Sequence, residues 1–234
     1  MTTASLRSVY PGPGGFDPRQ LRREFPIFGN NPGLVFLDSG ASAQKPASVI
    51  DRVAEYYRTD YANVHRGVYR LSARSTELYE EAREKVRAFL NAADSREIVF
   101  VRNTTEAINL VAQSWGPAFL KSGDEVLISV LEHHSNIVPW QLLRDRIGIK
   151  LVVTPLDATG GVDLAAFEAR LSPRTRLVAI THVANATGAV VPVETIVQLA
   201  HQRGAKVIID GINSEGLTGS MTDGTRILEP GVGW

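Results

Sequence analysis

Polar residues of types that bind ligands follow four apolar runs of this sequence. They are Asn103, Thr104 and Thr105 after "EIVFVR", His133 and His134 after "EVLISVL", Asn185 after "RLVAITHV", and Asp210 at the end of "KVIID". In open parallel sheets, ligands bind in the crevice beyond the carboxyl ends of the strands. If the apolar runs are such strands, these residues gather around one crevice.

Each of these residues also has an ordinary structural explanation. Asn103 can cap a helix, although the free N–H groups of that helix N-terminus also favour a phosphate. Adjacent histidines project in different directions, so His133 and His134 form a poor metal chelate and can instead pack or cap. Asn185 can form a turn or donate a hydrogen bond to a ligand. Asp210 is a carboxylate at a buried strand end, which is costly without a partner.

Together the residues supply what pyridoxal 5'-phosphate (PLP) needs from a protein. Its phosphate needs a helix N-terminus, and its ring needs a flat face on which to stack. Its phenolic oxygen needs a hydrogen-bond donor, and its ring nitrogen needs an anion that keeps it protonated as an electron sink. A charged Asp210 would serve as that anion.

The elements that must position these residues follow a regular pattern from residue 97 onward. Continuous apolar runs, separated by helical segments, predict strands at 97–101, 125–131, 150–153, 176–183 and 206–210. Such runs are apolar on both faces, as in a parallel sheet that helices cover on both sides. The fold class is therefore α/β, with an open, mostly parallel sheet.

Further elements are predicted before and between these strands. A short helix follows Asp17, a strand covers 34–38, a helix begins at Pro46, and a longer helix spans about 72–93. The helix boundaries are predicted by punctuation residues. Those at N-termini are Asn103 with Glu106 as a capping box, Ser135 and Asp163, and those at C-termini are Gly148 and Gly204.

Composition excludes several classes of function. The chain has 234 residues and a formal net charge of +0, which offers no excess charge to hold a nucleic acid or an anionic membrane surface. It has no apolar run long enough to cross a bilayer and no signal-peptide core at its start, so we expect a cytoplasmic protein. Its cysteine count of 0 excludes disulfides, thiolate metal sites and a cysteine nucleophile. We expect no bound metal.

Five motifs carry a resemblance to a known family: "LDSGASAQKP", "VHRGVYRLS", "VFVRNTTEAINLVAQSWG", "LEHHSNIVPWQLL" and "KVIIDG". In order and spacing they closely resemble the cysteine desulfurases of the sulfur-mobilisation (Suf-type) group, a branch of the class V aminotransferase family. The resemblance covers about residues 20–212. It implies the large domain of PLP fold type I and conversion of L-cysteine to L-alanine, with sulfur passed on for iron–sulfur cluster assembly.

The resemblance assigns cofactor contacts to matching positions. Thr104 and Thr105 match the phosphate-binding pair, and His133 matches the residue stacked on the cofactor ring. Asp210 matches the partner of the ring nitrogen. Asn185 matches the residue near the phenolic oxygen and the substrate carboxylate.

It assigns the substrate side to earlier segments. Gly40 and Ala41 fall in the loop that lines the substrate pocket. His65 and Arg66 match the "HRG" segment near the active site. The implied partners are L-cysteine, a second subunit in a homodimer or a full-length subunit, and a sulfur-acceptor protein.

The sequence departs from the family pattern after Asp210. Where the family has Asp-Gly-Ala-Gln, this chain has Asn213 in place of the glutamine beside the cofactor oxygen, and from Ser214 nothing matches. The family's Ser-Gly-His-Lys segment with the Schiff-base lysine, its catalytic cysteine and its small C-terminal domain have no counterpart. We therefore expect a flexible arm at 1–16, a partial PLP-dependent transferase-like large domain at 17–212, and a non-matching tail at 213–234.

These departures set the functional expectation. The chain as given should hold PLP weakly and without a covalent link, and should be inactive as a desulfurase. One alternative is a non-catalytic protein that binds PLP or a partner. The other is an enzyme of selenocysteine lyase type with the same fold.

Overall fold

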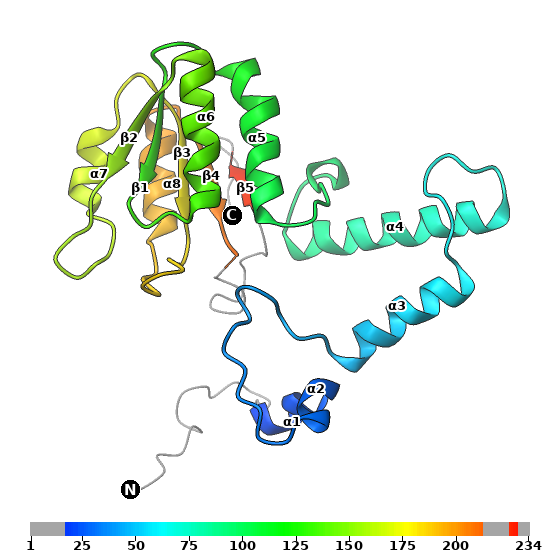
Figure 1. The fold of residues 1–234 in the computed structure, drawn as a ribbon. Helices are drawn as coiled ribbons and strands as arrows, with labels where there is room; N and C mark the ends of the chain where they lie inside the picture. The colour runs from blue at the N-terminus through cyan, green and yellow to red at the C-terminus, as the bar shows by residue number, and fades with distance from the viewer. Residues whose placement is uncertain (1–16, 213–224, 229–234) are drawn as a thin grey trace, which may run out of the picture. The chain divides into compact units, whose positions relative to one another are not determined.

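The structure, a computed structural model, describes residues 17–212 and 225–228 (Figure 1). It divides into a first unit, Met1–Ala82, and a second unit, Arg83–Trp234, with the boundary inside helix α4 (Arg70–Phe89). The predicted arm at 1–16 lies outside the described residues. So does the predicted tail at 213–234, apart from 225–228.

The first unit is helical. It contains α1 (Pro18–Arg23), α2 (Pro26–Asn30), α3 (Ala47–Thr59) and the beginning of α4. The Asp17 carboxylate caps α1 by accepting a hydrogen bond of 2.9 Å from the N–H of Arg19. Pro46 directly precedes α3, so the predicted helix start is confirmed.

The strand predicted at 34–38 is wrong. Those residues belong to no helix or sheet, and Val35 and Leu37 are 75% and 91% exposed. An apolar run becomes a strand only when a neighbouring strand pairs with its backbone. No described residue pairs with this segment.

The second unit is built on a five-stranded sheet in the order β2-β1-β3-β4-β5. Its strands are β1 (Glu125–Ser129), β2 (Lys150–Thr154), β3 (Thr175–Thr181), β4 (Lys206–Asp210) and β5 (Thr225–Leu228). The first four are mutually parallel, and in the register of β3 with β4, Thr181 lies beside Asp210. β5 runs antiparallel to β4, so the sheet continues beyond the last strand that the sequence predicts.

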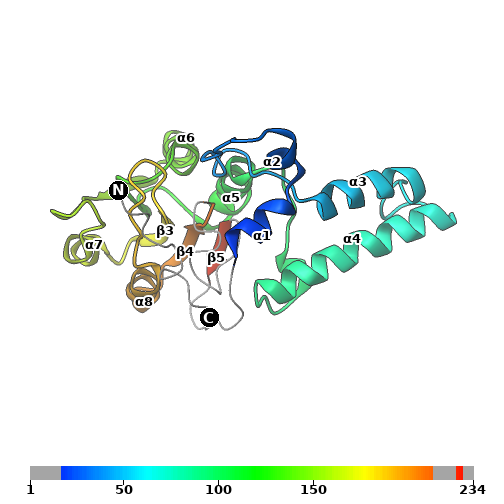
Figure 2. The same cartoon turned by 90° about the horizontal axis from the view of Figure 1, so that it is seen from below.

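Helices cover both faces of this sheet, as Figures 1 and 2 show. α5 (Thr104–Phe119) and α6 (Val138–Ile147) lie on one face, and α7 (Leu164–Arg170) and α8 (Val193–Gln202) lie on the other. Side chains along each strand alternate between two buried clusters: Ile208 packs with α5 and α6, while Val207 and Ile209 pack with α7 and α8. The predicted α/β class with a mostly parallel sheet is confirmed.

The strand predicted at 97–101 is also wrong. A 3-10 turn, η2 (Ser95–Glu97), occupies its start, and the rest joins no strand of the described sheet. Only Ile98 is buried, and its carbonyl accepts a hydrogen bond from the Arg83 guanidinium. Val99 and Phe100 are exposed, so the segment is apolar without being part of the core.

Most of the predicted helix boundaries are confirmed. Asn103 caps α5 and Asp163 caps α7, while Gly148 and Gly204 adopt left-handed φ values of 80° and 73° at helix ends. The capping box differs in detail, because the Glu106 carboxylate accepts from the N–H of Arg102 and not from that of Asn103.

Ser135 caps no helix. The cap of η3 (His134–Asn136), the turn that leads into α6, is the ring of His133, which accepts a hydrogen bond from the N–H of Ser135. The sequence rule failed because an imidazole nitrogen took the acceptor role that serine hydroxyls usually play.

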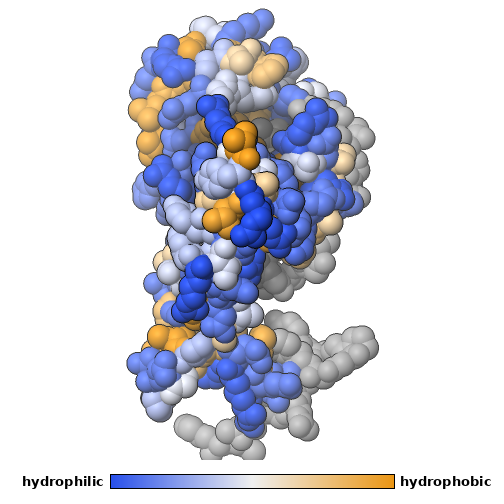
Figure 3. Space-filling model, turned by 90° about the vertical axis from the view of Figure 1, so that its right-hand side faces the viewer, coloured by the Kyte–Doolittle hydropathy of each residue, from blue (hydrophilic) through white to orange (hydrophobic). Residues whose placement is uncertain are grey.

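The surface of the described residues mixes polar and apolar side chains. Figure 3 shows apolar residues in orange among hydrophilic ones on the face that it draws. No helix among the described residues combines the length and apolar character that a membrane crossing requires.

Candidate functional site

The candidate site lies at the carboxyl edge of the second unit's sheet. Asp210 is the last residue of β4, His133 follows the end of β1, and Asn185 follows the end of β3. α5 packs against η3, the turn after His133, and Figure 1 shows α5 beginning at the end of the sheet where β4 stops. One unit therefore brings together five predicted residues: Thr104, Thr105, His133, Asn185 and Asp210.

Asp210 lies on the face of the sheet that α5 covers. It is two residues beyond Ile208, which packs on that face, and side chains alternate along a strand. Its residue is 1% exposed, and its Oδ1 accepts a hydrogen bond of 3.2 Å from the N–H of Ile212. Burial raises the pKa of Asp210, while that N–H and the nearby His133 oppose the rise. No Lys or Arg among the described residues forms an ion pair with Asp210.

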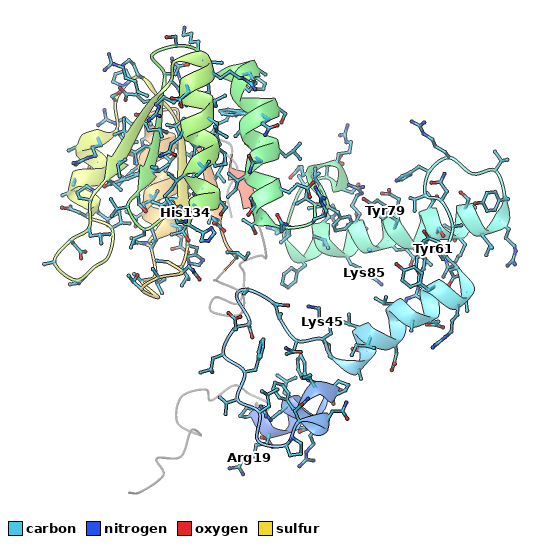
Figure 4. The ribbon with its side chains drawn as sticks, viewed as in Figure 1. Arg19, Lys45, Tyr61, Tyr79, Lys85 and His134 are labelled. Atoms are coloured by element: carbon cyan, nitrogen blue, oxygen red, sulfur yellow. The ribbon has the colours of Figure 1, made fainter. Side chains whose placement is uncertain are left out.

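His133 is held by its own turn. Its Nδ1 lies 2.9 Å from the Ser135 hydroxyl and accepts a hydrogen bond of 3.2 Å from the Ser135 N–H. The ring is exposed and meets the ring of His134 edge-on, with centroids 5.9 Å apart. Figure 4 labels His134 at this edge of the sheet. The turn thus fixes one ring nitrogen and leaves the ring face of His133 accessible.

Glu132 is a buried residue of the site that sequence reasoning missed. Its Oε1 accepts a hydrogen bond of 2.5 Å from the Ser129 hydroxyl, and its Oε2 accepts one of 2.7 Å from the Asn136 side chain. Asn136 in turn accepts a hydrogen bond of 3.0 Å from the indole N–H of Trp140. The available signal was a carboxylate between an apolar strand and two histidines, with an amide four residues later.

The electrostatics of Glu132 are set by its position. Burial raises the pKa of Glu132 to about 7, although its hydrogen bonds with Ser129, Asn136 and the Thr181 backbone oppose the shift. The charge of Asp210 adds to the rise. Glu132 and Asp210 are therefore two buried carboxyl groups of raised pKa near the carboxyl edge of the same sheet.

The N-terminus of α5 offers donors to an anion. The Asn103 side chain accepts the N–H of Glu106 at 2.9 Å, but the N–H groups of Thr104 and Thr105 have no acceptor among the described residues. Thr104 is half-buried and Thr105 is exposed. Free amides at the positive end of a sixteen-residue helix are typical of a phosphate site.

Asn185 lies in a tight turn after β3. The N–H of Gly188 donates 2.8 Å to the carbonyl of Ala184, and Gly188 has a φ of 70°. The turn explanation for Asn185 therefore holds. Its side chain is exposed, which leaves it free to reach a ligand.

The substrate-side residues belong to the first unit. Gly40 and Ala41 form a turn in which the N–H of Ala41 donates 3.2 Å to the carbonyl of Asp38. Arg66 is exposed. Asn213 lies outside the described residues.

His65 has the most defined geometry of the first-unit residues. It adopts a left-handed φ of 72°, and its N–H donates 2.9 Å to the Thr76 hydroxyl. Its Nε2 lies 3.3 Å from a Glu80 oxygen, and its ring meets that of Tyr79 edge-on with centroids 5.6 Å apart. A non-glycine residue held in this conformation indicates that surrounding contacts fix the histidine.

One histidine near the carboxyl edge of the sheet is buried. His182 follows β3, is 4% exposed, and its Nδ1 has no hydrogen-bond partner among the described residues. Burial lowers the pKa of His182, and the carboxylate of Glu194 opposes this. The folded chain therefore keeps His182 neutral at pH values where the unfolded chain protonates it.

We predict that His182 makes the fold sensitive to acid. Because its pKa is lowered by folding, its contribution is fully present above the ordinary histidine pKa of about 6.5 and is lost as the pH falls through the folded pKa. The variant His182→Gln should lose less stability than the wild type between pH 7.5 and pH 5 in urea unfolding. The exposed His134→Gln is the matched control. Equal losses in wild type and His182→Gln would contradict the prediction.

No group of three or more His, Asp or Glu side chains in the described part of the chain could hold a metal ion.

The sequence pattern of the aminotransferase class-V family matches residues 35–217. The chain belongs to this family. Among class-V relatives, a cysteine desulfurase of Synechococcus elongatus is 50% identical over 92% of this chain and 35% of its own length. One of Klebsiella pneumoniae is 50% identical over 84% of this chain and 49% of its own length.

Solved structures agree with the class-V assignment. A cysteine desulfurase of Escherichia coli matches with a TM-score of 0.74 and 39% identity, over 84% of this chain and 49% of that one. The apo cysteine desulfurase of Thermococcus onnurineus matches with a TM-score of 0.75 and 33% identity, over 91% of this chain and 56% of that one. This chain thus spans only about a third to a half of the curated relatives named here.

Proposed function

We propose that this chain is the cofactor-binding portion of a PLP-dependent cysteine desulfurase. The observation that carries the proposal is Asp210, a buried carboxylate at the end of β4 that has no ion-pair partner among the described residues. A buried charge without a partner is costly, and a protonated ring nitrogen would supply that partner. The 50% identity to cysteine desulfurases supports this reaction among those of the class-V family.

The remaining cofactor contacts are assigned to residues of the same unit. The amides of Thr104 and Thr105 bind the phosphate at the N-terminus of α5. His133 stacks on the ring, with its orientation fixed through Ser135. Asn185 donates to the phenolic oxygen, and Asn213 is assigned to the same oxygen by the resemblance alone.

The residues fit PLP chemically, because an anion, a flat ring and free amides all occur at one sheet edge. When bound, PLP supplies an electron sink for reactions at the α-carbon of an amino acid. Asp210 keeps a proton on the ring nitrogen, and the two amides of α5 hold the phosphate in place. His133 and the core beneath it exclude water from one face of the ring.

The substrate side is assigned to the first unit. The resemblance alone assigns contacts with L-cysteine to Gly40, Ala41, His65 and Arg66, and also to Asn185; the cation of Arg66 suits the substrate carboxylate. A homodimer or a full-length subunit supplies further surface. A sulfur-acceptor protein is the final partner.

The 234-residue chain itself is proposed to bind PLP weakly and not to turn over cysteine. It contains 0 cysteines, so it has no thiol to receive the substrate sulfur. A non-catalytic PLP-binding role and a selenocysteine lyase role remain alternatives that turnover assays separate.

We predict that Asp210→Ala weakens cofactor binding by about tenfold to a hundredfold. A charge-assisted hydrogen bond contributes about 1.5–3 kcal/mol, and about 1.4 kcal/mol corresponds to a factor of ten. The probe is pyridoxine 5'-phosphate, which keeps the ring nitrogen and the phosphate but has no aldehyde to react with lysines. Its dissociation constant is measured by tryptophan fluorescence quenching.

The matched control is Asp145→Ala, because the Asp145 side chain is 64% exposed on α6. It should bind the probe as the wild type does. Circular dichroism establishes that each variant is folded. Unchanged affinity in a folded Asp210→Ala protein would show that Asp210 does not hold the ring nitrogen. Absence of probe binding by the wild type would refute the proposed function.

A further inference from the structure

The turn that carries His133 rests on a buried chain of hydrogen bonds. The chain runs from Ser129 through Glu132 and Asn136 to Trp140, with donor–acceptor distances of 2.5, 2.7 and 3.0 Å. These four residues are 1%, 7%, 0% and 0% exposed. The Ser129 hydroxyl also accepts the N–H of Leu131 at 3.0 Å. The chain therefore ties the end of β1 to the beginning of α6, with Glu132 in its centre.

The same carboxyl group is a neighbour of Asp210. The backbone of Thr181 hydrogen-bonds to Glu132, and Thr181 lies beside Asp210 in the register of β3 with β4. Among charged groups on other elements, Asp210 raises the pKa of Glu132, and His133 lowers the pKa of Asp210. Two neighbouring buried carboxyl groups do not both ionise readily, so their protonation is coupled.

We propose that Glu132 is a positioning residue of the cofactor site, which anchors the His133 turn and whose charge is coupled to that of Asp210. The proposal rests on the proposed function for its ligand. The coupling between Glu132 and Asp210 is a property of the free chain. The proposal adds Glu132 to the cofactor site as a residue that touches neither the cofactor ring nor the phosphate.

The hydrogen bonds of Glu132 suit a protonated carboxyl group. One oxygen accepts from the Asn136 amide, and the other shares a hydrogen with the Ser129 hydroxyl, which can donate or accept. Glutamine has the same length, accepts through its oxygen and donates through its nitrogen. Glu132→Gln thus keeps the anchor but removes the ionisation, whereas Glu132→Ala removes both.

The first test uses the free chain and the indole N–H of Trp140. In the ¹⁵N-labelled 234-residue chain, the NMR signal of this N–H should titrate with a midpoint near the Glu132 pKa of about 7. Trp115→Phe and Trp234→Phe assign the three tryptophan signals. Glu132→Gln should abolish the titration, and Asp210→Asn should move its midpoint to lower pH. A titration that persists in Glu132→Gln, or a midpoint that Asp210→Asn leaves in place, would overturn the coupling.

The second test measures binding of pyridoxine 5'-phosphate from pH 5 to pH 9. Binding to the wild type should weaken in acid as Asp210 protonates. Glu132→Gln should bind within about twofold of the wild type at neutral pH and keep the same acid limb, because Glu132, with a pKa of about 7, is already uncharged where Asp210 protonates. Glu132→Ala, which loses the anchor, should bind at least about tenfold more weakly.

The outcomes separate the possible roles of Glu132. An acid limb that Glu132→Gln moves would mean that Glu132 is still ionised where Asp210 protonates, which would overturn the electrostatic part of the proposal. Normal binding by Glu132→Ala would overturn the anchoring part. If Glu132→Ala does not fold, the Gln variant and Asp210→Asn still decide the coupling. If the wild type binds no probe at any pH, the proposed function is wrong. The coupling between Glu132 and Asp210 is then tested by the indole titration alone.

Discussion

The 234-residue chain, incubated with PLP and L-cysteine, is expected to release no more alanine than a no-protein control. Sulfur transfer needs a nucleophile that takes the sulfur from the substrate, and the chain contains 0 cysteines. A cysteine desulfurase of full length, such as the one from Escherichia coli, would give alanine in the same assay. Against that enzyme the expected loss is complete within the sensitivity of the measurement.

The positions of the lysines support the same expectation. Lys150 and Lys206 are the first residues of β2 and β4, and Lys121 precedes β1, so all three lie at the amino edge of the sheet, opposite Asp210. Lys45 belongs to the first unit, and the exposed Lys85 lies on α4 (Figure 4). None of these follows a strand at the carboxyl edge.

The assay has two readouts that can contradict the expectation. One is alanine release above the no-protein control, with or without dithiothreitol as an added thiol. The other is borohydride reduction followed by intact mass and peptide mapping. A single stoichiometric cofactor adduct on one of the five lysines would show that the chain does offer an anchoring amine.

The second large effect concerns stability. Trp140→Ala should lower the free energy of unfolding by about 3–5 kcal/mol, the usual cost of removing a large aromatic side chain from a core. Trp140 is 0% exposed, packs between α6 and the sheet, and donates its indole N–H to Asn136. Urea unfolding followed by circular dichroism measures the change.

Two variants separate packing from hydrogen bonding in this result. Trp140→Phe keeps most of the ring and should lose only about 1–3 kcal/mol, the cost of leaving the Asn136 oxygen unpaired. Leu142→Ala on the same helix, 60% exposed, should change stability by no more than about 0.5 kcal/mol. An unfolding midpoint of Trp140→Ala equal to that of Leu142→Ala would contradict the assigned core.

The sequence predicts the strands correctly where an apolar run also pairs with a neighbouring strand. β1 to β4 coincide with the runs near 125, 150, 176 and 206 because buried parallel strands are apolar on both faces. The runs at 34–38 and 97–101 look the same locally. Hydropathy does not encode whether a partner strand lies alongside, and for these two no described residue provides one.

β5 was missed for the opposite reason. Residues 225–228, "TRIL", contain only two large apolar side chains and lie among glycines and polar residues. These residues form a strand because they pair with β4, whose edge opposite β3 has no other partner strand in the described sheet. A pattern within the segment itself could not have predicted it.

The sequence predicts where the candidate site lies but not which buried residues support it. Asp210, His133 and the N-terminus of α5 follow from the rule that ligands bind beyond the carboxyl ends of parallel strands. Glu132 was not identified, because its importance depends on burial and on its neighbours Ser129 and Asp210. The placement of first-unit residues such as His65 at the site stays a prediction from the resemblance.

The register of β4 against β3 determines which sequence changes the site tolerates. Asp210 faces α5 only because Thr181 lies beside it, and a shift of one residue would turn the carboxylate into the apolar core beneath α8 and present Ile209 to the crevice instead. A single-residue deletion inside 206–210 should therefore be far more damaging than an insertion of several residues at the exposed turn of Ala158 and Thr159, between β2 and α7. Related genes that differ in length at this part of the fold are expected to carry their gaps in that turn and never within the strand.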